Sequence, residues 1–131
     1  MLGDQIGEET GKVTGFRVLD AAGPKVEVSF QSKGKILGSD YQGRASYYSQ
    51  MQPGGFLYGE GQGMYMTSDG TAIWKGQGTG RLKPGGGASY RGAIHFTNAS
   101  GSLAKLAGTV GVFEHETDAN DNVVSKIWEW K

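Results

Sequence analysis

Apolar and polar residues alternate along nearly the whole chain from Lys12 onward. In residues 25–33, for example, the apolar side chains of Val26, Val28 and Phe30 are separated by single polar residues. Because successive side chains of a β-strand point to opposite faces, this period of two predicts strands with one buried face. The pattern therefore predicts an all-β protein.

Turn residues divide this pattern into eight predicted strands. The connections between the strands are short and hold no crossover helix, which is typical of an up-and-down meander. One longer interruption, residues 98–106, has room for a single helical turn through Leu103 and Leu106. The predicted strands cover residues 12–20, 25–33, 35–50, 56–68, 71–83, 88–97, 108–117 and 123–131.

The fold class that follows is a single closed barrel of eight antiparallel strands in up-and-down (meander) order. Eight strands close around an interior that side chains fill or that holds one small ligand. A two-sheet sandwich is the structural alternative, but its Greek-key connections need a long return loop that these turns do not provide. Residues 1–10 are polar and interrupted by glycine, so we expect a flexible N-terminal arm there and one β-barrel domain over residues 11–131.

Glycine recurs at every second position in two segments on either side of Asp69-Gly70. Asp-Gly is a preferred centre of a two-residue type I′ hairpin turn, because both residues tolerate positive φ. With that centre, Tyr65 faces Trp74 on the same side of the hairpin as the glycines. The expected glycine pairs are Gly63 with Gly76, Gly61 with Gly78 and Gly59 with Gly80.

The neighbouring strands place large side chains opposite these glycines. An odd-length loop before residue 56 sets Tyr47 opposite Gly59, and a three-residue loop within residues 84–88 sets Ile94 opposite Gly78. Large residues opposite glycine fill a curved sheet without overpacking it. We therefore expect the glycine face to line the barrel interior.

The last two strands meet at a turn through residues 120–122. A two-residue loop there pairs Phe113 with Trp128 and His115 with Lys126. We interpret the aromatic face of this hairpin as the inward one. That choice places His115 inside the barrel near its mouth, where water reaches it.

The charge balance, the lack of cysteine and the lack of a long apolar run limit the kinds of partner, metal site and cellular location that the sequence predicts. The 131 residues include thirteen basic and thirteen acidic side chains, so no basic surface for nucleic acid or an anionic membrane is expected. The chain has no cysteine, which excludes disulfides and thiolate metal sites. Neither a basic leader nor an apolar run of about 18 residues is present, so we predict a cytoplasmic bacterial protein.

Several short motifs together resemble a family of uncharacterised small bacterial proteins whose fold is similar to the barrel of plant allene oxide cyclases. The resemblance covers about residues 35–131 and implies an eight-stranded meander barrel with no established activity. No segment matches the site of the cyclase residue by residue, so the chemistry of that enzyme is not carried over. The motifs are GEGQG at 59–63, SDG at 68–70, KGQGTG at 75–80, YRGAIHF at 90–96, GVFEHE at 111–116 and WEWK at 128–131.

Aromatic residues on the expected inner face carry the main functional hypothesis. Alternating glycines contribute no side-chain volume, so the rings either fill the interior or wall a small apolar pocket. We predict a barrel that binds a small apolar ligand and needs no cofactor. The candidate ligand-binding residues are Tyr41, Tyr65, Trp74, Tyr90, Phe96, Phe113, Trp128, Gly61 and Gly78.

Acid–base chemistry is the alternative, since an isomerase or cyclase acting on an apolar substrate would need a proton-transfer group. The weak catalytic candidates are His115 and Glu114, which neighbour each other in a strand and so point to opposite faces. His95 and Arg91 are expected to face solvent. Two histidines on different faces make a poor metal site, and none is predicted.

An apolar patch on the outer face is expected at Met64, Met66 and Ile73. Exposed patches of this kind often mark a contact between subunits, so we predict a homodimer. A structural or interaction module with no internal ligand is a further alternative, in which this patch carries the function.

Overall fold

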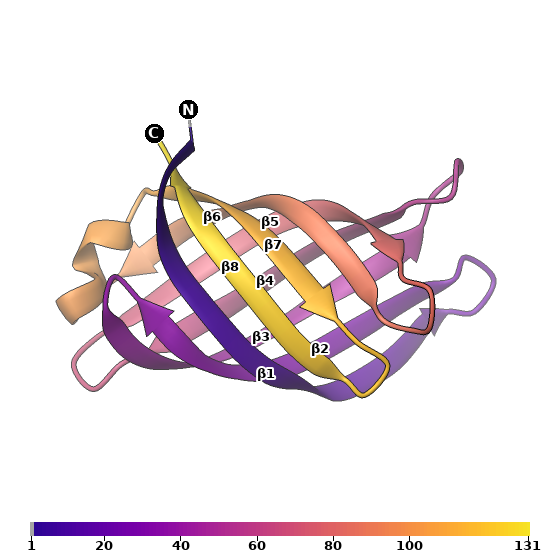
Figure 1. The fold of residues 1–131 in the computed structure, drawn as a ribbon, viewed down its shortest axis with the longest axis horizontal. Helices are drawn as coiled ribbons and strands as arrows, with labels where there is room; N and C mark the ends of the chain where they lie inside the picture. The colour runs from indigo at the N-terminus through magenta and orange to yellow at the C-terminus, as the bar shows by residue number, and fades with distance from the viewer. Residues whose placement is uncertain (1) are drawn as a thin grey trace.

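The computed structural model describes residues 2–131 and forms one closed barrel, with strands in the order β1 to β8 and β8 paired back to β1 (Figure 1). The predicted eight-stranded antiparallel meander is confirmed. Within residues 2–131, no helix is long and apolar enough to cross a membrane. The elements are β1 (Leu2–Asp20), β2 (Lys25–Ile36), β3 (Ser39–Met51), β4 (Leu57–Met66), β5 (Thr71–Leu82), β6 (Ala88–Ala99), the 3₁₀ helix η1 (Gly101–Leu106), β7 (Val110–Thr117) and β8 (Asn122–Trp130).

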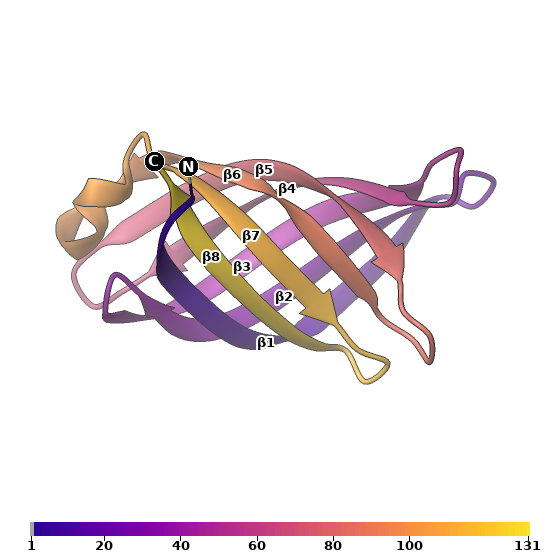
Figure 2. The ribbon, with the colours of Figure 1, turned by 45° about the horizontal axis from the view of Figure 1, so that its top comes forward.

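The two ends of the barrel differ. The loops after β1, β3, β5 and β7 gather at one end, whereas η1 and both chain ends lie at the other (Figures 1 and 2). The predicted helical turn is present as η1, whose Leu103 and Leu106 are fully buried. They pack in one cluster with Phe96 and Ile127, so apolar side chains close this end.

The turn between β4 and β5 differs from the type I′ prediction. The N–H of Thr67 donates to the carbonyl of Gly70 at 2.8 Å, so Ser68 and Asp69 form its centre. Neither Asp69 nor Gly70 has positive φ. Gly70 is needed for a close approach instead, because a Cβ there would overlap the Ser100 carbonyl oxygen just before η1.

This turn moves the β4–β5 register by two residues, and the β3–β4 and β5–β6 registers differ from prediction by the same amount. Because side chains alternate with a period of two, an even shift leaves every residue on its predicted face. Only the opposite partners change. The observed pairs include Gly61 with Gly76, Gly59 with Gly78, Gly63 with Trp74, Tyr47 with Gly61 and Gly80 with Tyr90.

Aromatic rings lie flat against several of these glycines. A Cβ added at Gly63 would lie 2.6 Å from the indole of Trp74, and one added at Gly80 would lie 2.6 Å from the ring of Tyr90. The expectation that glycine admits a ring from the neighbouring strand therefore holds, and each ring is fixed in position by the strand it covers.

The predicted flexible arm is wrong for residues 2–10, which belong to β1: the segment pairs with β8 from Leu2 onward and also with β2 from Gly7 onward. Glu9 faces Gly34 of β2 and Ser125 of β8 and is only 7 % exposed. The buried residues of this segment are Gly7 and Glu9, and only Ile6, beside an irregularity in the pairing with β8, packs against the core, so the segment shows no regular apolar alternation. The following strand, β2, continues to Ile36 instead of turning at residues 33–34.

The β7–β8 register differs from prediction by one residue, which reverses the faces of β8. The loop has three residues and not two, because the Asp118 carboxylate accepts hydrogen bonds from the N–H groups of Asn120 and Asn122, and Asp121 adopts a φ of 64°. Ser125 and Ile127 therefore face inward. Lys126 and Trp128 face outward, contrary to the expected pairings.

Candidate functional site

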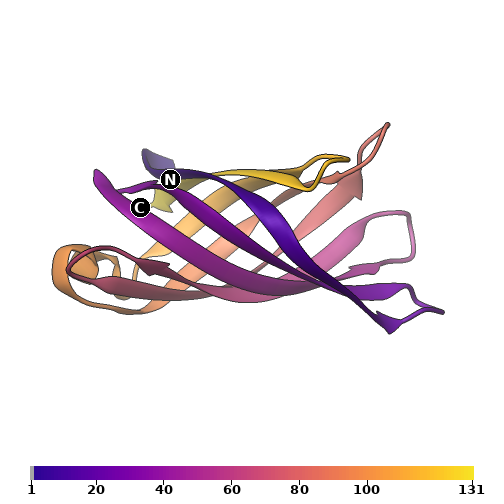
Figure 3. The same cartoon turned by 90° about the horizontal axis from the view of Figure 1, so that it is seen from below.

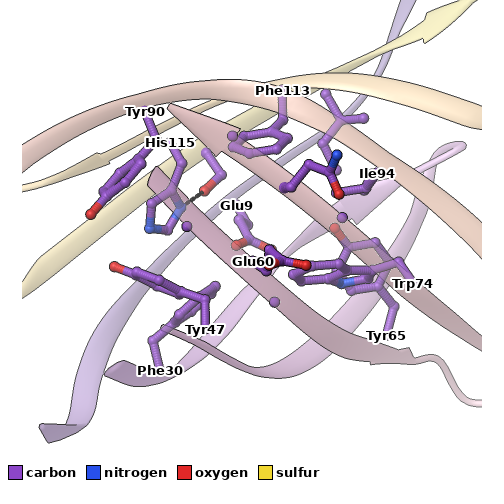
Figure 4. A pocket seen from close by; sticks show the side chains of 17 residues that line it. Glu9, Phe30, Tyr47, Glu60, Tyr65, Trp74, Tyr90, Ile94, Phe113 and His115 are labelled. Carbon is purple, nitrogen blue, oxygen red and sulfur yellow. Dashed lines mark hydrogen bonds between the residues drawn. The ribbon is translucent and has the colours of Figure 1, made fainter. Parts of the chain in front are cut away.

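The barrel interior holds a cavity of about 70 Å³ between the two ends (Figure 4). Four glycines of β4 and β5 line one side of it, namely Gly59, Gly61, Gly76 and Gly78. The absence of side chains at these positions leaves the space that the rings do not fill. The rings that line the cavity are those of Phe30, Tyr47, Tyr65, Trp74, Tyr90 and Phe113.

A second, wider space of about 520 Å³ opens at the loop end of the barrel. Figure 3 shows this end, where the β1–β2 hairpin projects, opposite η1. The lining of this wider space is largely apolar and includes Phe16 and Leu82, which are 67 % and 65 % exposed. Tyr47 and Tyr90 line both this mouth and the inner cavity, so their rings stand between the two spaces.

His115 lies at this boundary and is 7 % exposed. Its ring centroid is 5.1 Å from that of Phe30, 5.7 Å from Tyr47 and 6.1 Å from Tyr90. Its Nδ1 is 2.6 Å from the Oγ of Ser125. Burial lowers the pKa of His115 from 6.5 to about 4, although Glu116 nearby acts in the opposite direction, so the imidazole is neutral at pH 7.

Glu9 is the one buried carboxylate that lines the cavity. Its Oε1 accepts hydrogen bonds from the hydroxyl of Tyr41 at 2.5 Å and the hydroxyl of Ser32 at 3.1 Å. Burial raises the pKa of Glu9, while hydrogen bonds from Tyr41, Ser32 and Ser125 oppose that change. Ser125 is thus the direct cross-strand neighbour of Glu9 and is hydrogen-bonded to His115.

Two buried nitrogens at this cavity have no hydrogen-bond partner among the described residues, namely Nε1 of Trp74 and Nε2 of His115. Figure 4 shows His115 beside Tyr47 and Tyr90, with Trp74 across the cavity next to Tyr65. Leaving such a group unpaired costs about 1–3 kcal/mol. The cavity therefore has largely apolar walls and, on opposite sides, two nitrogens without a hydrogen-bond partner, Nε1 of Trp74 and Nε2 of His115.

Most of the candidate ligand-binding residues meet at this cavity. Tyr41 and Phe96 are inside the barrel but belong to the packed cluster that η1 closes. The prediction that Trp128 faces the interior is wrong, because the one-residue change of register puts it opposite Val112 on the outer face. The candidates that line the cavity are Tyr65, Trp74, Tyr90, Phe113, Gly61 and Gly78.

The two acid–base candidates, Glu114 and His115, lie on opposite faces of β7. Glu114 lies on the outer face, where its carboxylate is 3.7 Å from the Nε of Arg91 and its cross-strand neighbour is Lys126. His115 lies inside, as expected, but it is buried beside Ser125 and not solvated beside Lys126. His95 is exposed, in agreement with its predicted outward orientation.

Several cavity residues were not among the candidates, including Phe30, Tyr47, Ser125 and Glu9. Phe30 and Tyr47 stand on faces that the sequence already marks as inward, so the alternating pattern could have included them. Ser125 depends on the β7–β8 register, which one loop residue decides. Glu9 carries no sequence signal that separates it from the exposed acidic residues around it.

Within residues 2–131, no group of three or more His, Cys, Asp or Glu side chains is arranged to hold a metal ion. The polar groups of the cavity suit hydrogen bonding to an uncharged molecule, because no lysine or arginine of the described residues lines it. Comparisons of the chain with protein-family models, curated proteins and solved structures found no match. The resemblance to the allene-oxide-cyclase-like family accordingly stays a prediction.

Proposed function

We propose that this protein binds a small, largely apolar ligand inside its barrel. The observation that carries the proposal is the pair of unpartnered nitrogens, on Trp74 and His115, at an otherwise apolar cavity. Buried polar groups are nearly always hydrogen-bonded in folded proteins, and each exception needs an explanation, such as a catalytic role or a bound molecule that supplies the missing partner. Apolar walls with a few placed polar groups are also the usual composition of a ligand site.

The shape of the barrel supplies a route for the ligand. Leu103 and Leu106 close one end, whereas the loop end opens into the apolar mouth. The rings of Tyr47 and Tyr90 separate this mouth from the inner cavity with their centroids 5.8 Å apart, so a ligand entering there must move them apart. A volume of 70 Å³ corresponds to roughly five waters. A ligand with a six-membered ring would therefore also occupy part of the mouth beside Tyr47 and Tyr90.

Toluene binding tests the proposal, because toluene offers one ring and no polar group. Calorimetric titration should show one site per chain. Ile127→Phe places a larger side chain in the cavity and should weaken binding, whereas Val124→Phe, on the exposed face of the same strand, should leave it unchanged. Failure of wild type to bind toluene, or equal binding by both variants, would count against an internal site. Mass spectrometry of an organic extract would then identify any ligand that the purified protein carries.

An isomerase or cyclase is the second candidate function, and the neutral His115 favours it. A neutral imidazole with a free Nε2 at an apolar cavity is suited to take a proton from a bound substrate. Glu114 lies outside, so among the described residues Glu9 is the one buried carboxylate that lines this cavity. If the protein is an enzyme, His115→Gln should change the compound recovered from the purified protein from product to substrate; recovery of the same compound from both would argue for binding alone.

The predicted homodimer is a separate proposal that rests on the outer face of β4 and β5. Met64 and Ile73 are cross-strand neighbours and are 44 % and 40 % exposed, with Met66 beside them. Sedimentation of wild type and Met64→Glu tests it. A dimer that dissociates in the variant supports this contact, and a monomeric wild type rules it out.

A further inference from the structure

Glu9, Ser125 and His115 lie in one row across three adjacent strands. Ser125 of β8 is directly opposite Glu9 of β1 on one side and directly opposite His115 of β7 on the other. All three side chains face the interior and line the cavity. The Ser125 hydroxyl thus lies between the Glu9 carboxyl group, its neighbour across β1 and β8, and the imidazole whose Nε2 lacks a partner.

Counting protons along this row determines what Nε2 can do. A serine hydroxyl has one proton to donate, and a carboxylate is a stronger acceptor than a neutral imidazole nitrogen. Tyr41 and Ser32 already direct their hydroxyl protons to Glu9, so the carboxylate is surrounded by donors. When Ser125 also donates to Glu9, its oxygen must accept the hydrogen bond from Nδ1 of His115. The proton of the neutral ring then resides on Nδ1, and Nε2 carries a lone pair.

We propose that the chain Glu9–Ser125–His115 holds His115 in its Nδ1–H form, so that Nε2 selects ligands with an O–H or N–H donor beside an apolar body. This inference rests on the proposed function, since it names the class of ligand for the same cavity. Glu9 and Ser125 are positioning residues, because they act through His115. Trp74, across the cavity, adds a donor that suits an acceptor on the ligand.

Two other classes of ligand, carboxylates and purely apolar molecules, fit the cavity less well. A carboxylate ligand would lie near Glu9 with no cation of the described residues lining the cavity to pair with it. A purely apolar ligand would leave Nε2 unpaired. A phenol satisfies both conditions: its ring matches the aromatic walls and its hydroxyl donates to Nε2.

The histidine tautomer can be measured without any ligand. Imidazole nitrogen shifts from long-range proton–nitrogen NMR spectra distinguish the Nδ1–H from the Nε2–H form, and exposed His95 is the only other histidine. We expect Nδ1–H for His115 at pH 7.5. In Glu9→Gln the amide can donate to Ser125, which turns the serine proton toward Nδ1, so the Nε2–H form should appear. Glu8→Gln, on the exposed face of the same strand, is the control and should change nothing.

If Glu9→Gln does not fold, Ser125→Ala gives an independent answer, because it removes the link and should leave a mixture of tautomers. An Nε2–H form in wild type overturns the inference. So does a tautomer that both Glu9→Gln and Ser125→Ala leave unchanged.

Phenol and anisole test the ligand class. They share a ring and an oxygen, but only phenol can donate a hydrogen bond. Wild type should bind phenol about tenfold more tightly than anisole, the effect of one buried hydrogen bond, and Glu9→Gln should bring the ratio near one. Equal binding by wild type overturns the inference while leaving the binding function intact. Failure of phenol, anisole and toluene alike overturns the binding function itself, whereas the NMR result still judges the hydrogen-bonded row.

Discussion

Replacing His115 by glutamine should remove much of the sensitivity of this fold to mild acid. Burial lowers the pKa of His115 to about 4 in the folded protein, against 6.5 when it is exposed. Between these values the unfolded chain holds one more proton than the folded protein. Stability linked to His115 is therefore complete above pH 6.5 and is lost as the pH falls toward 4.

The magnitude follows from the two pKa values. Between pH 7.5 and pH 4.5, the free energy of unfolding of wild type should fall by about 2.5 kcal/mol more than that of His115→Gln. Glu9 acts in the opposite direction, because its pKa is raised in the folded protein and its protonated form is stabilised there as the pH falls. Since Glu9 is present in both proteins, the difference between them isolates His115.

Urea denaturation followed by tryptophan fluorescence at several pH values measures these free energies. His95→Gln is the matched control, because that histidine is exposed on the outer face of β6, and its curve should run parallel to wild type. If the His115→Gln curve also runs parallel to wild type, His115 is not buried as a neutral group. The reasoning about the cavity would then fail with it.

Three other changes test the packing of the barrel, each by urea denaturation. Leu103→Ala removes a fully buried plug side chain and should cost about 2–5 kcal/mol; a cost below 1 kcal/mol would mean that η1 does not close the barrel. Gly63→Ala forces a methyl group into the indole that lies 2.6 Å away and should cost about 1–3 kcal/mol, whereas Gly15→Ala meets only ordinary contacts and should be neutral. Ser49→Ala leaves the buried hydroxyl of Tyr90 unpaired and should cost about 1–3 kcal/mol, and the double variant with Tyr90→Phe should lose less than the sum of the single changes.

The sequence was sufficient for the barrel because alternation and short turns report directly on strand number and order. It also placed the rings of Tyr65, Trp74 and Tyr90 on the correct face, although the partners opposite them were wrong. The registers of β3–β4, β4–β5 and β5–β6 each differed from prediction by two residues. Because side chains alternate between faces with a period of two, an even shift keeps every side chain on its predicted face.

The site was harder to predict because single residues decide it. One additional loop residue, held by Asp118, turned Trp128 outward and brought Ser125 beside His115. Glu9 is surrounded in the sequence by residues typical of an exposed arm, and it is buried by the pairing of β1 with β2 and β8 and by the contact with Tyr41 of β3. Long-range pairing of this kind leaves no local pattern.

The closure of β1 against β8 also determines when the site forms. Glu9 lies near the start of the chain and Ser125 near its end, so their contact has one of the largest sequence separations in the molecule. Contacts of that kind form late in folding, because they close the longest loops. We therefore expect the row of polar groups at the cavity to assemble in the step that completes the barrel, and a ligand bound there to stabilise the closed barrel against separation of its two terminal strands.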